Sequence, residues 1–152
     1  MKFKPRIIMK KTPTFIVVAA IALGFILAGQ QQTGKVSGTH LGTWQLISTK
    51  YGDAKDFSDF PNEQRRVKLI TATHFTWVQY GTASKMVESI AGGPYTLDGD
   101  SYTETIEFVG TGMETYLGKK QPFTIKVNGD KLNQSGQLSD GLKIEEVWQR
   151  LK

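Results

Sequence analysis

Hydrophobic and polar residues alternate along most of the chain beyond residue 42, and this period of two predicts β-strands. In the first run, alternation places Trp44 and Leu46 on one face, with Gln45 and Ile47 on the other. β-Branched and aromatic residues are enriched in these runs, as is typical of strands. The expected strands are 43–50, 66–71, 74–80, 94–97, 101–109, 123–128, 131–137 and 142–151.

The connections between these runs are short and rich in turn residues. Asp98-Gly99 and Asn128-Gly129 are strong hairpin signals, because glycine accepts positive φ without steric cost. No run shows the spacing of a long amphipathic helix. Serial hairpins and an even strand count predict an all-β fold, and they favour a single up-and-down antiparallel β-barrel over a sandwich. A barrel has no free strand edges.

Three stretches break the alternation, and we expect them to be irregular. Residues 83–90 in the second stretch are consistent with a ragged strand or with one helical turn. Phe57 and Phe60 lie in the first stretch, where they either plug one end of the core or form a lid over a pocket. The three stretches are 51–64, 81–93 and 110–120.

The N-terminal part has the pattern of an export signal. Residues 15–28 are apolar apart from Gly24, and basic residues precede them. Such a run is too short for a spanning helix of about 20 residues but suits a secretory signal. We therefore expect a signal peptide at 1–29, a polar tether at 30–41 and a barrel at 42–152, in a periplasmic or secreted protein. A retained N-terminal anchor is the alternative.

The net charge of +5 comes from the leader. Five basic residues precede the apolar run, which leaves 19 − 5 = 14 basic residues against 14 acidic ones. The predicted domain is therefore neutral and has no electrostatic footprint for nucleic acid. After signal cleavage we expect no stable membrane span. The chain has no cysteine, so its core alone must hold the fold.

The two ends of the predicted barrel carry a family resemblance. Gly42-Thr43-Trp44 matches the G-x-W signature of lipocalins and related calycins, and Arg150 resembles the arginine that packs on that tryptophan. Residues 75–78 (F-T-W-V) and 92–104 (G-G-P-Y-T-L-D-G-D-S-Y-T-E) are similar to motifs of small bacterial lipocalin-like proteins. The resemblance implies a barrel that binds a small, usually apolar, molecule.

An eight-stranded barrel either fills itself with side chains or holds one small ligand. With Trp44 inward, alternation also places Val67, Leu69, Ile106, Ile125 and Ile144 inside. The residues that we expect to contact a ligand are Trp44, Leu46, Phe75, Trp77, Tyr102, Glu104, Phe108, Phe123, Glu146, Trp148 and Arg150.

Three charged residues share these interior faces. An unpaired charge in an apolar interior is very costly, so Glu104, Glu146 and Arg150 are expected to form an internal polar cluster. Arg150 has an alternative role as a cap on Trp44 at the barrel end. A shifted register of the last strand would instead place Val147 and Leu151 inward and send Glu146 and Arg150 to solvent.

Catalytic and cofactor motifs are absent from the sequence. It has no nucleophile elbow, no phosphate-binding loop and no paired metal-binding histidines. We expect no metal and no cofactor, and His74 is an unsuitable haem ligand because it is predicted to face outward. The expected function is therefore binding of a small apolar or amphipathic molecule. The alternatives are a filled barrel that acts as an envelope interaction module and an enzyme based on Glu104 or Glu146.

Overall fold

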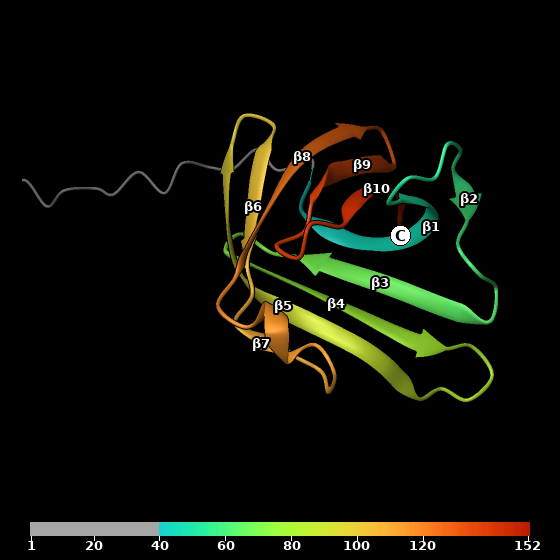
Figure 1. Ribbon diagram of the computed structural model, residues 1–152. Helices are drawn as coiled ribbons and strands as arrows, with labels where there is room; N and C mark the ends of the chain where they lie inside the picture. Colours follow the sequence, from blue (N-terminus) through green and yellow to red (C-terminus); the bar gives the residue numbers. More distant parts are fainter. Residues whose placement is uncertain (1–39) are drawn as a thin grey trace, which may run out of the picture. The chain divides into compact units, whose positions relative to one another are not determined.

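Eight antiparallel strands close into a barrel in the computed structural model of the chain, which describes residues 40–152 (Figure 1). Each strand pairs with the next one along the chain, and the last strand pairs back with the first. The predicted all-β, up-and-down barrel is thus confirmed. The predicted signal peptide, and most of the tether, lie outside the described residues. The barrel strands are β1 (Gly42–Tyr51), β3 (Gln64–Ile70), β4 (His74–Gly81), β5 (Val87–Asp98), β6 (Ser101–Thr105), β8 (Lys120–Asn128), β9 (Lys131–Gln137) and β10 (Lys143–Arg150).

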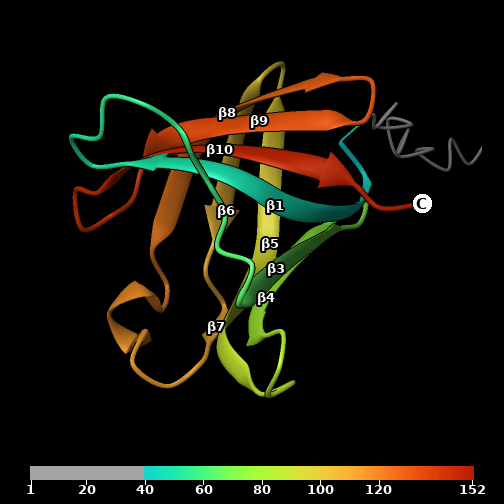
Figure 2. The same cartoon turned by 90° about the vertical axis from the view of Figure 1, so that its right-hand side faces the viewer.

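Closure depends on the pairing of β1 with β10, which lie side by side in Figure 2. Trp44 is opposite Arg150, and Leu46 is opposite Trp148, with a bulge after Leu46. On its other side, β1 pairs with β3 only along Gly42–Gln45. Beyond that point the short strand β2 (Ser58–Asp59) takes the place of β3 beside β1.

The predicted strand 101–109 is wrong at its C-terminal end. Strand β6 stops at Thr105, and a separate short strand, β7 (Phe108–Val109), pairs with β5. A long connection containing a 3₁₀ helix, η1 (Glu114–Tyr116), then leads to β8. Conversely, the stretch 81–93 is less irregular than predicted, because β5 already begins at Val87.

Gly92 and Gly93 allow the segment between β6 and β7 to approach β5 closely, and both of these strands pair with β5. A Cβ atom on Gly93 would collide with the carbonyl oxygen of Thr105, and one on Gly92 would collide with the Phe108 ring. The Glu107 amide donates to the Gly92 carbonyl across this approach, at 2.8 Å. The pair of glycines therefore makes room for the turn from β6 into β7.

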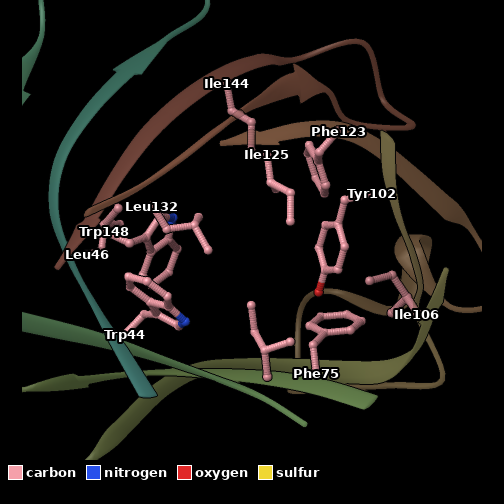
Figure 3. Close-up of a cluster of buried hydrophobic side chains, with 11 residues drawn as sticks. Trp44, Leu46, Phe75, Tyr102, Ile106, Phe123, Ile125, Leu132, Ile144 and Trp148 are labelled. Carbon is pink, nitrogen blue, oxygen red and sulfur yellow. The ribbon is translucent and has the colours of Figure 1, made fainter. Parts of the chain in front are cut away.

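Large side chains from most strands point into the barrel and form its hydrophobic core (Figure 3). Trp44 and Tyr102 are fully buried, at 0% exposure. Strand β10 has the predicted face, because Glu146 is buried between neighbours on the same side, so the shifted register is wrong. The buried hydrophobic core consists of Trp44, Leu46, Ile70, Phe75, Tyr102, Ile106, Phe123, Ile125, Leu132, Ile144 and Trp148.

The predicted face of β3 is wrong. Leu69 is 41% exposed and Val67 only half-buried, whereas Lys68 and Ile70 are buried. Residues directly opposite in an antiparallel pair share a face of the sheet. Since Lys68 is opposite Trp44, the inward tryptophan brings the lysine inside as well.

Candidate functional site

The barrel interior contains a cavity of about 320 Å³. It lies towards the end of the barrel where β1 finishes and β10 begins, and the half-exposed Tyr116 and exposed Leu142 mark its mouth. Its lining residues are Tyr51, Arg66, Lys68, Trp77, Ser89, Ala91, Glu104, Ile106, Met113, Tyr116, Gln121, Phe123, Gln134, Leu138, Leu142, Ile144, Glu146 and Trp148.

The deepest polar group of the cavity is a buried ion pair. The Lys68 Nζ atom lies 2.7 Å from Glu104 Oε1, and it donates a second hydrogen bond to Gln134 Oε1 at 2.8 Å. Lys68 is 1% exposed and Glu104 3% exposed. Burial raises the pKa of the Glu104 carboxyl, and the neighbouring Lys68 ammonium opposes that rise.

Aromatic rings surround this ammonium group. Lys68 Nζ lies 5.1 Å from the Trp148 ring centroid, 5.7 Å from that of Phe75 and 5.9 Å from that of Tyr102. The negative faces of aromatic rings attract a cation, so these contacts stabilise a charge that has left water. Burial, followed by the nearby Glu104 carboxylate, also raises the pKa of Tyr102.

A second polar cluster lies nearer the mouth. Arg66 donates two hydrogen bonds to Gln79 Oε1, at 2.6 and 2.9 Å, and its guanidinium lies 4.9 Å from the Trp77 ring. Arg66 also lies 3.5 Å from Glu146 Oε1. Glu146 accepts further hydrogen bonds from the Tyr51 hydroxyl and, at 3.1 Å, from Trp148 Nε1. This second carboxylate is therefore fully engaged with the protein.

Five of the residues predicted to contact a ligand line the cavity, and the other six do not. Trp44, Leu46, Phe75 and Tyr102 belong to the packed core outside the lining. Phe108 is 43% exposed because the chain leaves β6 before reaching it, so its predicted interior placement is wrong. The five lining residues are Trp77, Glu104, Phe123, Glu146 and Trp148.

Arg150 caps the barrel end, as one of the two alternatives predicted. Its guanidinium carbon lies 4.0 Å from the Trp44 ring centroid, and its Nη1 donates to the Leu41 carbonyl at 2.7 Å. The prediction of an internal cluster of Glu104, Glu146 and Arg150 is therefore wrong about the cation, because Arg150 does not lie inside. Arg66 and Lys68 fill that role, and sequence reasoning missed both because it judged β3 by hydrophobicity rather than by its pairing partner.

The irregular stretches contribute differently to the packed core and to the cavity lining. Phe60 packs against the core and lies 5.5 Å from the Arg66 guanidinium, which fits the predicted plug, whereas Phe57 is 47% exposed. Neither phenylalanine lines the interior cavity. Met113 and Tyr116, from the connection between β7 and β8, line it instead.

Both histidines of the barrel have ordinary structural contacts. His40 Nε2 is 3.1 Å from the Tyr95 hydroxyl, and the His40 carbonyl accepts from Trp44 Nε1 at 2.8 Å. His74 is exposed and bonds to Thr73. Within residues 40–152, no three acidic, histidine or cysteine residues gather as a metal site would require. The same part of the chain has no helix of the length and apolarity that a membrane span needs.

Comparison with known proteins supports the fold alone. No protein-family model and no curated protein matches the sequence. The chain is similar in structure to an uncharacterized protein from Bacteroides eggerthii, with a TM-score of 0.52 and 14% sequence identity. The match covers 73% of this chain and 98% of the other. The match supports the β-barrel fold and no finer assignment.

Proposed function

We propose that this protein is an exported, lipocalin-like barrel that binds a small amphipathic molecule in its interior. The cavity of about 320 Å³ is the observation that supports this proposal. It is at the lower end of the range of about 300–1,000 Å³ for ligand sites. Apolar walls with a few convergent polar groups are also typical of such sites.

The shape of the interior supports a compact ligand. Packed core side chains occupy the end of the barrel near Trp44, and the cavity lies towards the other end. Trp77, Phe123 and Trp148 supply aromatic walls, while Lys68 and Glu104 lie at the polar floor. A ligand with one apolar body and one polar end would match both parts.

A cavity-filling variant tests binding directly. Ala91 is buried and lines the cavity, so Ala91→Phe should occupy the space that a ligand needs. Thr124→Phe on the exposed face of β8 is the matched control. Native mass spectrometry of protein purified from the cell envelope should detect a co-purifying small molecule on the wild type and on the control. It should be lost from Ala91→Phe.

Two results together would contradict the proposal: a wild type that carries no small molecule, and cavity tryptophans whose fluorescence responds to none in a screen.

The leader sequence supports export. Cleavage after residue 29 would release a protein that begins at Gln30. Mass determination of the protein from periplasmic and culture fractions should show this shortened chain. An intact N-terminus in the membrane fraction would instead favour the retained anchor.

A further inference from the structure

We propose that the cavity selects an uncharged ligand whose polar end carries both a hydrogen-bond donor and an acceptor, as a primary amide does. This inference rests on the proposed binding function and specifies the class of ligand. It follows from two features of the lining: the sum of its charges, and the hydrogen-bonding groups that the protein leaves available.

The charges that line the cavity cancel. Arg66 and Lys68 supply two positive charges, and Glu104 and Glu146 supply two negative ones. The Lys68 ammonium is buried as deeply as Glu104, so it needs this carboxylate as its counter-charge. Tyr51 and Tyr116 also line the cavity, and their pKa values are raised, by burial for Tyr51 and by Asp140 for Tyr116, so both phenols are neutral.

A charged ligand would therefore enter without a free counter-charge. Each cation of the lining already has a carboxylate partner, Lys68 with Glu104 and Arg66 with Glu146. Removing an ion from water into such a site is costly unless it is paired and hydrogen-bonded. An ionic head group would have to break one of these internal pairs, whereas a neutral head group would leave both intact.

The floor of the cavity retains one donor and one acceptor side by side. Lys68 binds the Oε1 atoms of both Glu104 and Gln134, which turns the amide oxygen of Gln134 towards the lysine. The Gln134 Nε2 group makes no hydrogen bond within residues 40–152, and Glu104, which also interacts with the Tyr102 hydroxyl, retains acceptor capacity at Oε2. Gln121, by contrast, uses both ends of its amide on Ser139. A primary amide could accept from Gln134 and donate to Glu104 at the same time.

Three probes with one aromatic body test this selectivity: 1-naphthaleneacetamide, 1-naphthaleneacetate and 2-(1-naphthyl)ethylamine. Isothermal titration calorimetry at pH 7.5 should show the neutral amide binding the wild type at least ten-fold more tightly than either ion. Weak binding of naphthaleneacetate should be accompanied by uptake of a proton by the protein, because Glu104 must be neutralised to release Lys68. That uptake appears as an enthalpy that depends on the buffer, and amide binding should lack it.

Charge variants of the floor should change the preference in opposite directions. Glu104→Gln leaves Lys68 unpaired, so naphthaleneacetate should become the tightest ligand. Lys68→Met leaves Glu104 unpaired, so the ammonium probe should become the tightest. Gln134→Met should weaken amide binding without favouring either ion, and Lys126→Met on the exposed face of β8 should change nothing. General loss of stability cannot produce two opposite shifts.

The outcomes separate this inference from the proposed function. Equal binding of the three probes to the wild type, or tighter binding of an ion, would overturn the inference and leave the binding function in place. Binding of none of them, together with no co-purifying molecule, would overturn both. If a charge variant fails to fold, the buffer dependence of the wild-type enthalpy decides, because proton-free binding of naphthaleneacetate contradicts the required neutralisation of Glu104.

Discussion

Trp44 and Arg150 connect the first and last strands of the barrel through side chains as well as backbone. The indole is fully buried, and its Nε1 donates to the His40 carbonyl. The guanidinium covers one face of the ring and binds the Leu41 carbonyl. The tryptophan thus packs inside this end of the barrel, and the arginine covers it.

Replacing Trp44 by alanine should lower the free energy of unfolding by about 3–5 kcal/mol, the range for truncating a large buried aromatic residue. Chemical denaturation followed by circular dichroism measures this loss. Trp77→Ala is a useful comparison, because Trp77 is only half-buried and faces the cavity, and it should cost less. A loss below about 1 kcal/mol for Trp44→Ala would contradict the packing described above.

Arg150→Met should destabilise the barrel by about 1–2 kcal/mol, because it keeps the aliphatic stem but removes the cation and its hydrogen bond. Arg150→Lys should have an intermediate effect, since a lysine ammonium cannot stack as a planar guanidinium does. Thermal denaturation of the three proteins would rank them. Equal melting temperatures for Met and Arg would show that the stacking contributes nothing.

Trp44 and Arg150 could be predicted from sequence because a short motif marks each of them. The interior cations could not be predicted in this way. In the β3 sequence Q-R-R-V-K-L-I, hydrophobicity favours Val67 and Leu69 as interior residues, but the pairing of Lys68 with Trp44 decides the opposite. Register between distant strands is a tertiary property, so a single strand does not reveal which face it buries.

At the scale of elements, the segment between β6 and β7 packs closely against β5, with which both strands pair. Gly92 and Gly93 let this segment approach, and the chain then runs through η1 to the mouth. Turn signals predicted both hairpins correctly, since the Gly99 and Gly129 turns have positive φ. The break after Thr105 was not predictable, because alternation continues through Phe108 in the sequence although the strand does not.

Gly93→Ala should destabilise the protein by about 3 kcal/mol, the upper part of the range for overpacking, because its Cβ would meet backbone atoms of Thr105 and Glu107. Gly99→Ala is the matched control. Gly99 has a φ of 57° but open space around it, so only the backbone penalty of about 1 kcal/mol applies. Denaturation of both variants in urea checks the difference, and equal losses would contradict the close approach at Gly93.

At the scale of the whole molecule, the buried Lys68–Glu104 pair makes stability depend on pH. Burial raises the pKa of Glu104 above its ordinary value of 4.5, so the folded protein holds this proton more tightly than the unfolded chain. The favourable contribution of Glu104 to the free energy of unfolding is complete below that ordinary pKa and is lost as pH rises through the raised pKa. It is therefore opposite in sign to the contribution of Asp140, whose pKa the Tyr116 hydroxyl lowers.

We expect the difference in free energy of unfolding, wild type minus Glu104→Gln, to fall as pH increases from about 4.5 towards neutrality. Denaturant titrations of both proteins at a series of pH values measure this difference. Titrating groups that do not interact with Glu104 contribute equally to the two proteins and cancel. A difference that stays constant, or grows with pH, would show that the ion pair with Lys68 outweighs burial.

The pairing of β1 with β10 also has a consequence for folding kinetics. Trp44 and Arg150 come from opposite ends of the barrel sequence, and none of the intervening hairpins can complete the core without the last strand. Contacts of such long sequence separation slow folding, because loop-closure entropy is lost before the contacts form. Because the chain is synthesised from its N-terminus, the barrel must therefore remain open until β10 is available. Pairing of β10 with β1 therefore limits the rate at which the barrel closes. Shortening the chain within β10 should leave an unclosed, aggregation-prone sheet rather than a smaller barrel.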